Sequence, residues 1–179
     1  MTDDTDDLAS RPTTLTARFS MSGWDPAPLA GLDGDGGWVG AIVMRKTYTA
    51  GILGESVAEF LSSGREETGR GDVAAERITG RLEDGRSGAF TVHHGGLQHP
   101  GGGSTFGYLV PGSGTGDFAE WAGTARIDHD DEGAFFTFVL EWWGSGADRD
   151  PPASERESAG PPCWGWWVSI RPCGAARPA

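Results

Sequence analysis

The sequence predicts an all-β fold in which eight short antiparallel strands form a barrel or a sandwich. Glycine supplies 30 and proline 11 of the 179 residues, and the glycine share is more than twice the usual ~7%. This composition favours short strands joined by tight turns over a helical bundle. Apolar and polar residues alternate in short segments along the middle of the chain, and no long interval shows a helical period. Short connections between such segments are typical of antiparallel architectures.

The composition divides the chain into three zones. Residues 1–13 are polar and rich in aspartate, which predicts a disordered acidic tail. Residues 14–143 hold the alternating segments and form the predicted β-domain. Residues 144–179 are rich in glycine, proline and tryptophan, and predict a low-complexity, disordered tail.

The predicted strands follow one another along the middle zone, and glycine-rich turns separate them at 33–37, 83–85 and 101–103. A single helical turn is compatible with residues 118–121. The strands are predicted over 14–22, 39–50, 53–62, 73–82, 87–94, 104–110, 123–129 and 134–142.

Alternation within these strands assigns side chains to shared faces, because successive strand residues point to opposite sides of a sheet. We expect the set that holds the apolar residues to face the interior. On that rule the interior sets are Phe90, Val92 and His94; Met44, Lys46 and Tyr48; and Glu76, Ile78 and Gly80.

Some charged residues therefore fall among apolar ones. Polar groups inside a barrel are costly unless they are paired. We expect Lys46, Glu59, Glu76 and His94 to form a small polar cluster at the floor of a pocket. The alternative is that they form ordinary ion pairs at the barrel rim or on its outer surface.

Charge and segment properties exclude several classes of partner. The formal net charge is −12, which argues against nucleic acid or an anionic membrane surface as the main partner. The longest apolar run is too short for a transmembrane helix, and the acidic N-terminal stretch does not resemble a secretory signal. We expect a cytoplasmic protein. The two cysteines, Cys163 and Cys173, predict no disulfide framework.

Motif searches favour neither a metal nor a nucleotide cofactor. Adjacent strand residues such as His93 and His94 point to opposite faces, so they do not chelate one ion easily. The acidic run 128–133 lacks the glutamate that an EF-hand needs at its twelfth position, and we expect a hairpin turn there. The glycine-rich run 111–116 is followed by Asp117 and lacks the Gly-Lys-Ser/Thr ending of a phosphate-binding loop. We expect no metal and no cofactor.

Five tryptophans gather near the C-terminal end of the sequence and allow three interpretations. They could form a ligand-stacking wall or partner anchor, they could fold back over an open barrel edge or mouth, or they could belong to an extension without function. These residues are Trp142, Trp143, Trp164, Trp166 and Trp167.

Residues 14–142 resemble the DUF3224 family, a family of small, mostly bacterial domains of unknown function. The resemblance keeps the family's order and spacing, and the stretch Val110-Pro111-Gly112-Ser113-Gly114-Thr115-Gly116-Asp117-Phe118 is its most specific part. The other matching segments are 22–25, 45–56, 76–82 and 85–95. The resemblance implies an eight-stranded antiparallel β-barrel of the allene-oxide-cyclase-like, calycin-like kind, often a homodimer. Gly107 departs from the pattern, where a bulky aromatic residue is expected, and the Trp-rich tail lies beyond the family's usual end. The resemblance implies no activity and no catalytic residues.

Three functions remain open, and the sequence does not decide whether the protein is an enzyme. The first is binding of a small apolar or amphipathic molecule in the barrel. The second is a cofactor-free cyclase or isomerase that acts on a reactive polyene or epoxide. The third is an interaction module that uses the acidic surface and the Trp-rich tail. The predicted ligand-lining residues are Phe90, Val92, Phe106, Tyr108, Phe136 and Phe138. The candidate catalytic residues are Glu59, Glu76, Lys46, Tyr48 and His94.

Overall fold

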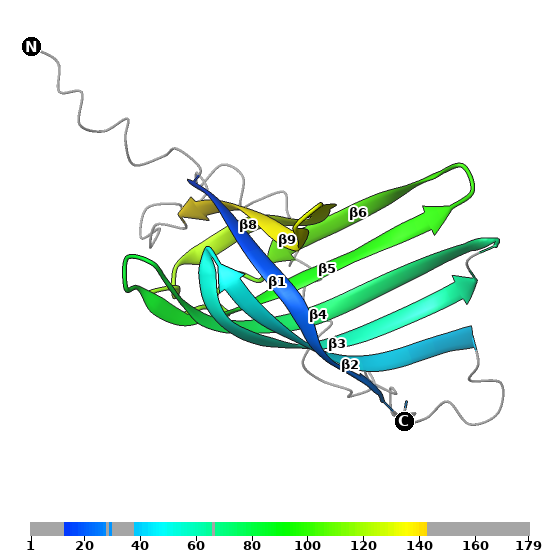
Figure 1. Ribbon diagram of the computed structural model, residues 1–179, viewed down its shortest axis with the longest axis horizontal. Helices are drawn as coiled ribbons and strands as arrows, with labels where there is room; N and C mark the ends of the chain where they lie inside the picture. The colour runs from blue at the N-terminus through cyan, green and yellow to red at the C-terminus, as the bar shows by residue number, and fades with distance from the viewer. Residues whose placement is uncertain (1–12, 28, 30–37, 66, 143–179) are drawn as a thin grey trace, which may run out of the picture. The chain divides into compact units, whose positions relative to one another are not determined.

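The structure is a computed structural model that describes residues 13–27, 29, 38–65 and 67–142. All eight segments predicted as strands are strands, and a short additional strand, β7, lies between the sixth and seventh of them (Figure 1). The described part of the chain contains no α-helix. The predicted tails lie outside the described residues, apart from Thr13. The strands are β1 (Thr13–Pro26), β2 (Val39–Ala50), β3 (Ile52–Arg65), β4 (Gly69–Leu82), β5 (Ser87–His99), β6 (Gly102–Leu109), β7 (Thr115–Gly116), β8 (Trp121–Asp130) and β9 (Gly133–Trp142).

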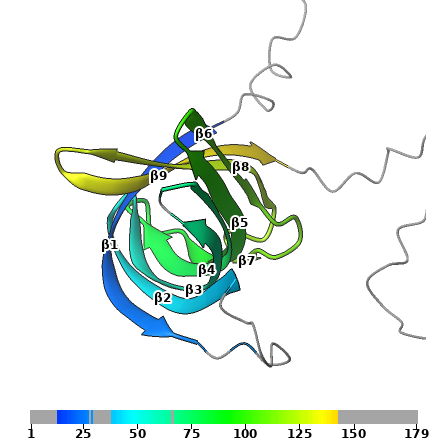
Figure 2. The ribbon, with the colours of Figure 1, turned by 90° about the vertical axis from the view of Figure 1, so that its right-hand side faces the viewer.

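The eight longer strands close into an antiparallel barrel. The strands pair in the order β4-β3-β2-β1-β9-β8-β6-β5, and an additional pairing between β4 and β5 completes the ring (Figure 2). The two-residue strand β7 adds only to the start of β5. The contact between β6 and β8 that closes the ring is short and consists of two residue pairs. The predicted eight-stranded antiparallel β-barrel is confirmed.

Gly107 explains how β6 reaches β8 to close this ring. A Cβ atom at Gly107 would lie 2.3 Å from the carbonyl oxygen of Ala125 in β8. β6 and β8 pair only at Tyr108 with Thr124 and at Leu109 with Gly123. The glycine that departs from the family pattern therefore permits a close approach between the backbones of these two strands.

Aromatic side chains fill one end of the barrel. The Phe90 ring packs against those of Phe118, Trp121 and Phe138, with centroids 5.9, 5.2 and 5.5 Å away. Phe118 comes from the connection between β7 and β8, where the amide N–H of Trp121 donates a hydrogen bond to the Phe118 carbonyl. This connection consists of hydrogen-bonded turns, where the sequence allowed a helical turn. Ile52 and Leu82 belong to the same buried cluster, so the turns that join β2 to β3 and β4 to β5 lie at this packed end.

The hairpins β3–β4 and β5–β6 project from the opposite end (Figure 1). β5 continues to His99, although the sequence predicted its end at His94. Phe106 pairs with Gly95 across the hairpin, and its ring covers the glycine. An aromatic ring over a cross-strand glycine supports the strand where the glycine itself offers no packing.

Candidate functional site

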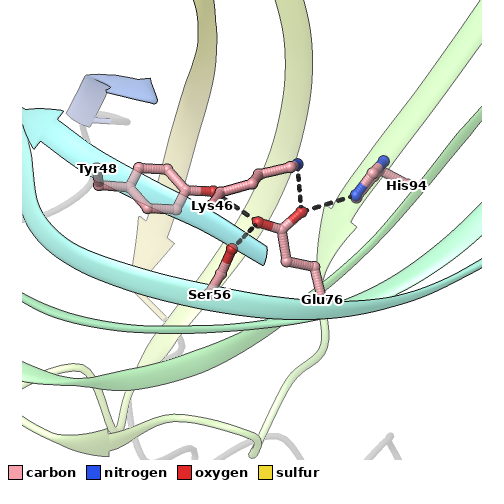
Figure 3. Close-up of polar contacts among 5 residues, drawn as sticks. All are labelled: Lys46, Tyr48, Ser56, Glu76 and His94. Atoms are coloured by element: carbon pink, nitrogen blue, oxygen red, sulfur yellow. Dashed lines mark hydrogen bonds and ion pairs between the residues drawn. The ribbon is translucent and has the colours of Figure 1, made fainter. Parts of the chain in front are cut away.

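Five polar side chains from four neighbouring strands meet inside the barrel (Figure 3). Lys46 and Tyr48 come from β2, Ser56 from β3, Glu76 from β4 and His94 from β5. Each alternates with outward-facing neighbours, and the exposed fraction of each residue is below a tenth. The strand period of two therefore directs all five toward one point in the interior. We call this group the Glu76 cluster.

The Glu76 carboxylate is the centre of the cluster and accepts four hydrogen bonds. Its Oε1 atom accepts from the Tyr48 hydroxyl at 2.7 Å and from the Ser56 hydroxyl at 2.5 Å. Its Oε2 atom accepts from Lys46 Nζ at 2.6 Å and is 3.0 Å from His94 Nε2. A carboxylate offers about four acceptor positions. All of them are used, so the fully buried charge is well compensated.

These contacts determine the charge of the cluster. Burial alone would raise the pKa of Glu76, but hydrogen bonds from His94, Lys46 and Ser56, with the charge of Lys46, outweigh burial and lower the pKa to about 2. Burial lowers the pKa of Lys46, and Glu76 opposes that change. Burial and the neighbouring carboxylate raise the pKa of Tyr48 well above its ordinary value. Glu76 is therefore ionised at neutral pH, and Tyr48 keeps its proton and acts as a donor.

Aromatic rings support the buried ammonium group. Lys46 Nζ lies 4.3 Å from the centroid of the Phe19 ring and 4.9 Å from that of Phe136. Such cation–π contacts favour a desolvated cation. The ring of His94 packs edge-on against Phe136, with centroids 5.4 Å apart. These ring contacts therefore fix the positions of Lys46 and His94, the two nitrogen-bearing partners of Glu76.

A cavity of about 550 Å³ lies beside the cluster, toward the end of the barrel from which the β5–β6 hairpin projects. We call it the mouth cavity. His94 is the one member of the Glu76 cluster that lines it. The other polar side chains on its wall include those of Arg70, Asp72, Gln98, Thr105 and His129. Its apolar wall includes Leu97, Phe106 and Ile127. A polar, titratable side chain thus connects the interior charge pair with a space large enough for a small molecule.

The structure brings together four of the five candidate catalytic residues. Lys46, Tyr48, Glu76 and His94 belong to the cluster, whereas Glu59 is exposed. Glu59 pairs with Val43 on β2 and follows the fully buried Ala58. Since alternate residues face opposite sides, Glu59 points outward and does not join the cluster.

Of the six predicted ligand-lining residues, Phe106 alone lines the mouth cavity. The side chains of Phe90, Val92, Phe136 and Phe138 are completely buried, and they pack against one another as core. Phe106 and Tyr108 are on the outer face, about half exposed, because Leu109 is the inward-facing residue of that strand. Phe106 still reaches the edge of the mouth cavity, and Tyr108 forms a hydrogen bond with His93.

Sequence reasoning did not identify most of the cavity wall. Arg70, Asp72 and Gln98 lie where β4 and β5 extend beyond their predicted limits of 73–82 and 87–94. Ser56 was missed as a partner of Glu76, because the cross-strand register decides that contact. The alternation of β3 puts Ser56 on the inward face with Ala58, and this signal was present in the sequence.

The described residues contain no group of three or more His, Cys, Asp or Glu side chains that could hold a metal ion. They also include no helix with the length and apolar character needed to span a membrane.

Comparisons with known proteins identify the family. The model of the family described as "Protein of unknown function (DUF3224)" matches residues 15–141. The chain belongs to the DUF3224 family. A crystal structure of a DUF3224 protein with unknown function from Shewanella oneidensis MR-1 is similar, with a TM-score of 0.65 and 26% sequence identity. The match covers 75% of this chain and 100% of that one. No curated protein matches the chain.

Proposed function

We propose that this DUF3224 barrel binds a small amphipathic molecule in the mouth cavity. The observation that carries the proposal is the cavity of about 550 Å³ with His94 and the buried Glu76 cluster at its side. Ligand sites in proteins are commonly about 300–1,000 Å³ in volume and combine apolar walls with a few placed polar groups. The mouth of a β-barrel is one of the preferred positions for such sites.

The wall chemistry favours an amphipathic ligand over a purely apolar one. Leu97, Phe106 and Ile127 supply an apolar surface, whereas Arg70 and Gln98 supply N–H donors. Within the described residues Arg70 forms no ion pair. An apolar molecule with one hydrogen-bonding or anionic group satisfies both parts of this wall.

A cavity-filling variant tests the proposal. Ile127→Trp adds a large side chain on the cavity wall, and Val57→Trp adds the same group on the exposed outer face. The probe is anilinonaphthalene sulfonate, an amphipathic dye, and its fluorescence titration gives the dissociation constant. We expect Ile127→Trp to weaken binding about tenfold or more and Val57→Trp to leave it unchanged, a difference of about 1.4 kcal/mol. Equal affinities in the two variants and the unsubstituted protein would place the dye elsewhere and reject the proposal.

A second candidate function is contact with another protein, and the observation that favours it is an apolar surface on the outer face. Leu61, Val73 and Phe106 lie in one cross-strand row, with Gly95 between Val73 and Phe106. Each of the three is more than a third exposed. Together with Leu97 they line a groove on this face. Grouped apolar side chains of this kind commonly mark association surfaces.

We propose a second copy of this chain as the occupant of that outer groove. A two-fold axis brings the same apolar row of two copies face to face, which makes the contact self-complementary. Light scattering after size exclusion should give the mass of a dimer, and Val73→Lys should give the mass of a monomer. A monomer at all concentrations before any substitution would reject the homodimer.

A further inference from the structure

The tautomer of His94 follows from its contact with Glu76. Nε2 of His94 lies 3.0 Å from Oε2 of a carboxylate whose pKa is lowered to about 2. An ionised carboxylate only accepts hydrogen bonds, so Nε2 carries the proton. In the neutral ring the lone pair then belongs to Nδ1. The edge-on contact with Phe136 holds the ring plane in place.

Nδ1 of His94 faces away from Glu76 (Figure 3). It has no hydrogen-bond partner among the described residues, and it is not one of the polar side-chain atoms that these residues bury without a partner. Nδ1 is therefore not sealed inside the protein. Since His94 lines the mouth cavity, a molecule in the cavity can reach this nitrogen.

We propose that His94 is a general base which removes a proton from a small carbonyl compound with an acidic C–H bond, bound in the mouth cavity. Glu76 is the positioning residue, because it fixes the tautomer and the direction of the ring. The reaction class is a cofactor-free isomerisation by proton transfer. This inference rests on the proposed ligand site and goes beyond it, since binding alone requires no basic nitrogen.

The proposed step balances without an oxidant or a metal. The Nδ1 lone pair takes the proton from the carbon next to the carbonyl group, and the electron pair of the broken C–H bond moves onto the carbonyl oxygen. The resulting imidazolium has the Glu76 carboxylate beside its other nitrogen. When the carbonyl compound carries a β,γ double bond, the enolate charge extends to the γ carbon, and return of the same proton from Nδ1 to that carbon yields the conjugated isomer. Arg70 and Gln98 offer N–H donors in the same cavity for the enolate oxygen.

Lys46 is the counter-ion of the carboxylate that positions His94. Lys46 Nζ shares the Oε2 atom with His94 and compensates the charge of Glu76. The other titratable groups on the cavity wall are Arg70, Asp72 and His129. The Glu76 cluster thus holds the His94 imidazole beside the apolar wall of the mouth cavity, an arrangement suited to proton abstraction.

The test uses nitrobenzisoxazole, a neutral aromatic probe that reports on a base. Removal of its ring proton breaks the N–O bond and releases a coloured cyanophenolate, and the proton then passes from the base to water. We expect the full-length protein to open the probe about 100-fold faster than the His94→Gln variant, which is the lower end of the usual effect of a general base. The matched control is His93→Gln, because His93 faces outward and contacts Tyr108. It should retain the full rate.

His94→Gln is a suitable variant because Glu76 keeps its other three donors, Lys46, Tyr48 and Ser56. The kcat of the His94→Gln variant should fall, while its KM changes by less than about twofold. The kcat/KM of the unsubstituted protein should rise with pH to a plateau, and the His94→Gln variant should lack this rise. A double variant, Lys46→Met with Glu76→Gln, tests the positioning residue. It should lower the plateau of this pH profile without loss of probe binding.

Probe binding is measured separately by equilibrium dialysis, so the two proposals fail in different ways. Saturable binding with equal rates in the His94→Gln variant and the unsubstituted protein would overturn the general base and leave the ligand site intact. Absence of saturable binding would contradict both. Saturable binding with a rate that depends on His94 supports both.

Discussion

Glu76→Gln should destabilise the barrel because it removes the charge that four side chains surround. The pKa of Glu76 in the folded protein is about 2, against an ordinary value of 4.5. At 1.36 kcal/mol per pKa unit this difference corresponds to about 3 kcal/mol of stability at neutral pH. Removal of one partner from a buried ion pair independently predicts about 3–5 kcal/mol, since Lys46 loses its counter-ion. The two values agree on a loss of about 3 kcal/mol or more.

The assay is urea unfolding followed by circular dichroism, at neutral pH and at lower pH values. A depressed carboxyl pKa stabilises the folded state above the ordinary pKa, and this contribution disappears as the pH falls from about 4.5 to about 2. The difference in unfolding free energy between the protein and Glu76→Gln should shrink over that window. Glu59→Gln is the matched control, because Glu59 is exposed on the outer face. It should change stability by less than about 0.5 kcal/mol.

A loss below about 1 kcal/mol for Glu76→Gln at neutral pH would refute this reasoning. So would a loss that is the same at low and neutral pH, because the effect would then not come from the ionised carboxylate. Other acidic groups, such as Asp130, also titrate in this window, since the Arg18 hydrogen bond lowers the Asp130 pKa to about 2. Their contribution cancels when the variant and the unsubstituted protein are compared at each pH.

Three further predictions concern the barrel itself. Gly107→Ala brings a Cβ atom to 2.3 Å from the Ala125 carbonyl oxygen. Urea unfolding should show a loss of about 1–3 kcal/mol in the free energy of unfolding. An unchanged unfolding midpoint would show that β6 shifts freely. Phe138→Ala empties part of a fully buried aromatic core, and calorimetry should show a loss of about 3–5 kcal/mol. Deletion of residues 144–179 should leave the near-ultraviolet dichroism of the barrel unchanged, because the closed ring of strands is complete within the described residues up to 142. A lost signal would show that the barrel needs the tail.

Local patterns were sufficient to predict the strands and part of the cluster. The alternation of Lys46 and Tyr48 with Arg45 and Thr47 identifies the inward face of β2, because the strand period is independent of the neighbours. The same logic succeeds for Glu76 and for His94. Applied to β3, it places Glu59 on the outer face, because Glu59 directly follows the inward Ala58. The prediction that Glu59 joins the cluster overlooked this alternation.

Contacts between strands could not be predicted from the same patterns. The cavity wall depends on how far β4 and β5 extend, and this depends on Phe106 covering Gly95 across a hairpin. The core aromatics were expected around a ligand, but Phe118 and its connection fill that end of the barrel. Such packing results from long-range register, which a period of two does not encode.

The ring nitrogens of His94 provide the most direct test of the central claim, that Glu76 holds a basic nitrogen toward the mouth cavity. A two-bond proton–nitrogen correlation spectrum, recorded with and without nitrobenzisoxazole, identifies the tautomer and its response to the probe. We expect a neutral ring with the proton on Nε2 and an Nδ1 signal that moves when the probe is added. A proton on Nδ1 of the neutral ring, or an Nδ1 signal unaffected by a saturating probe, would contradict the account.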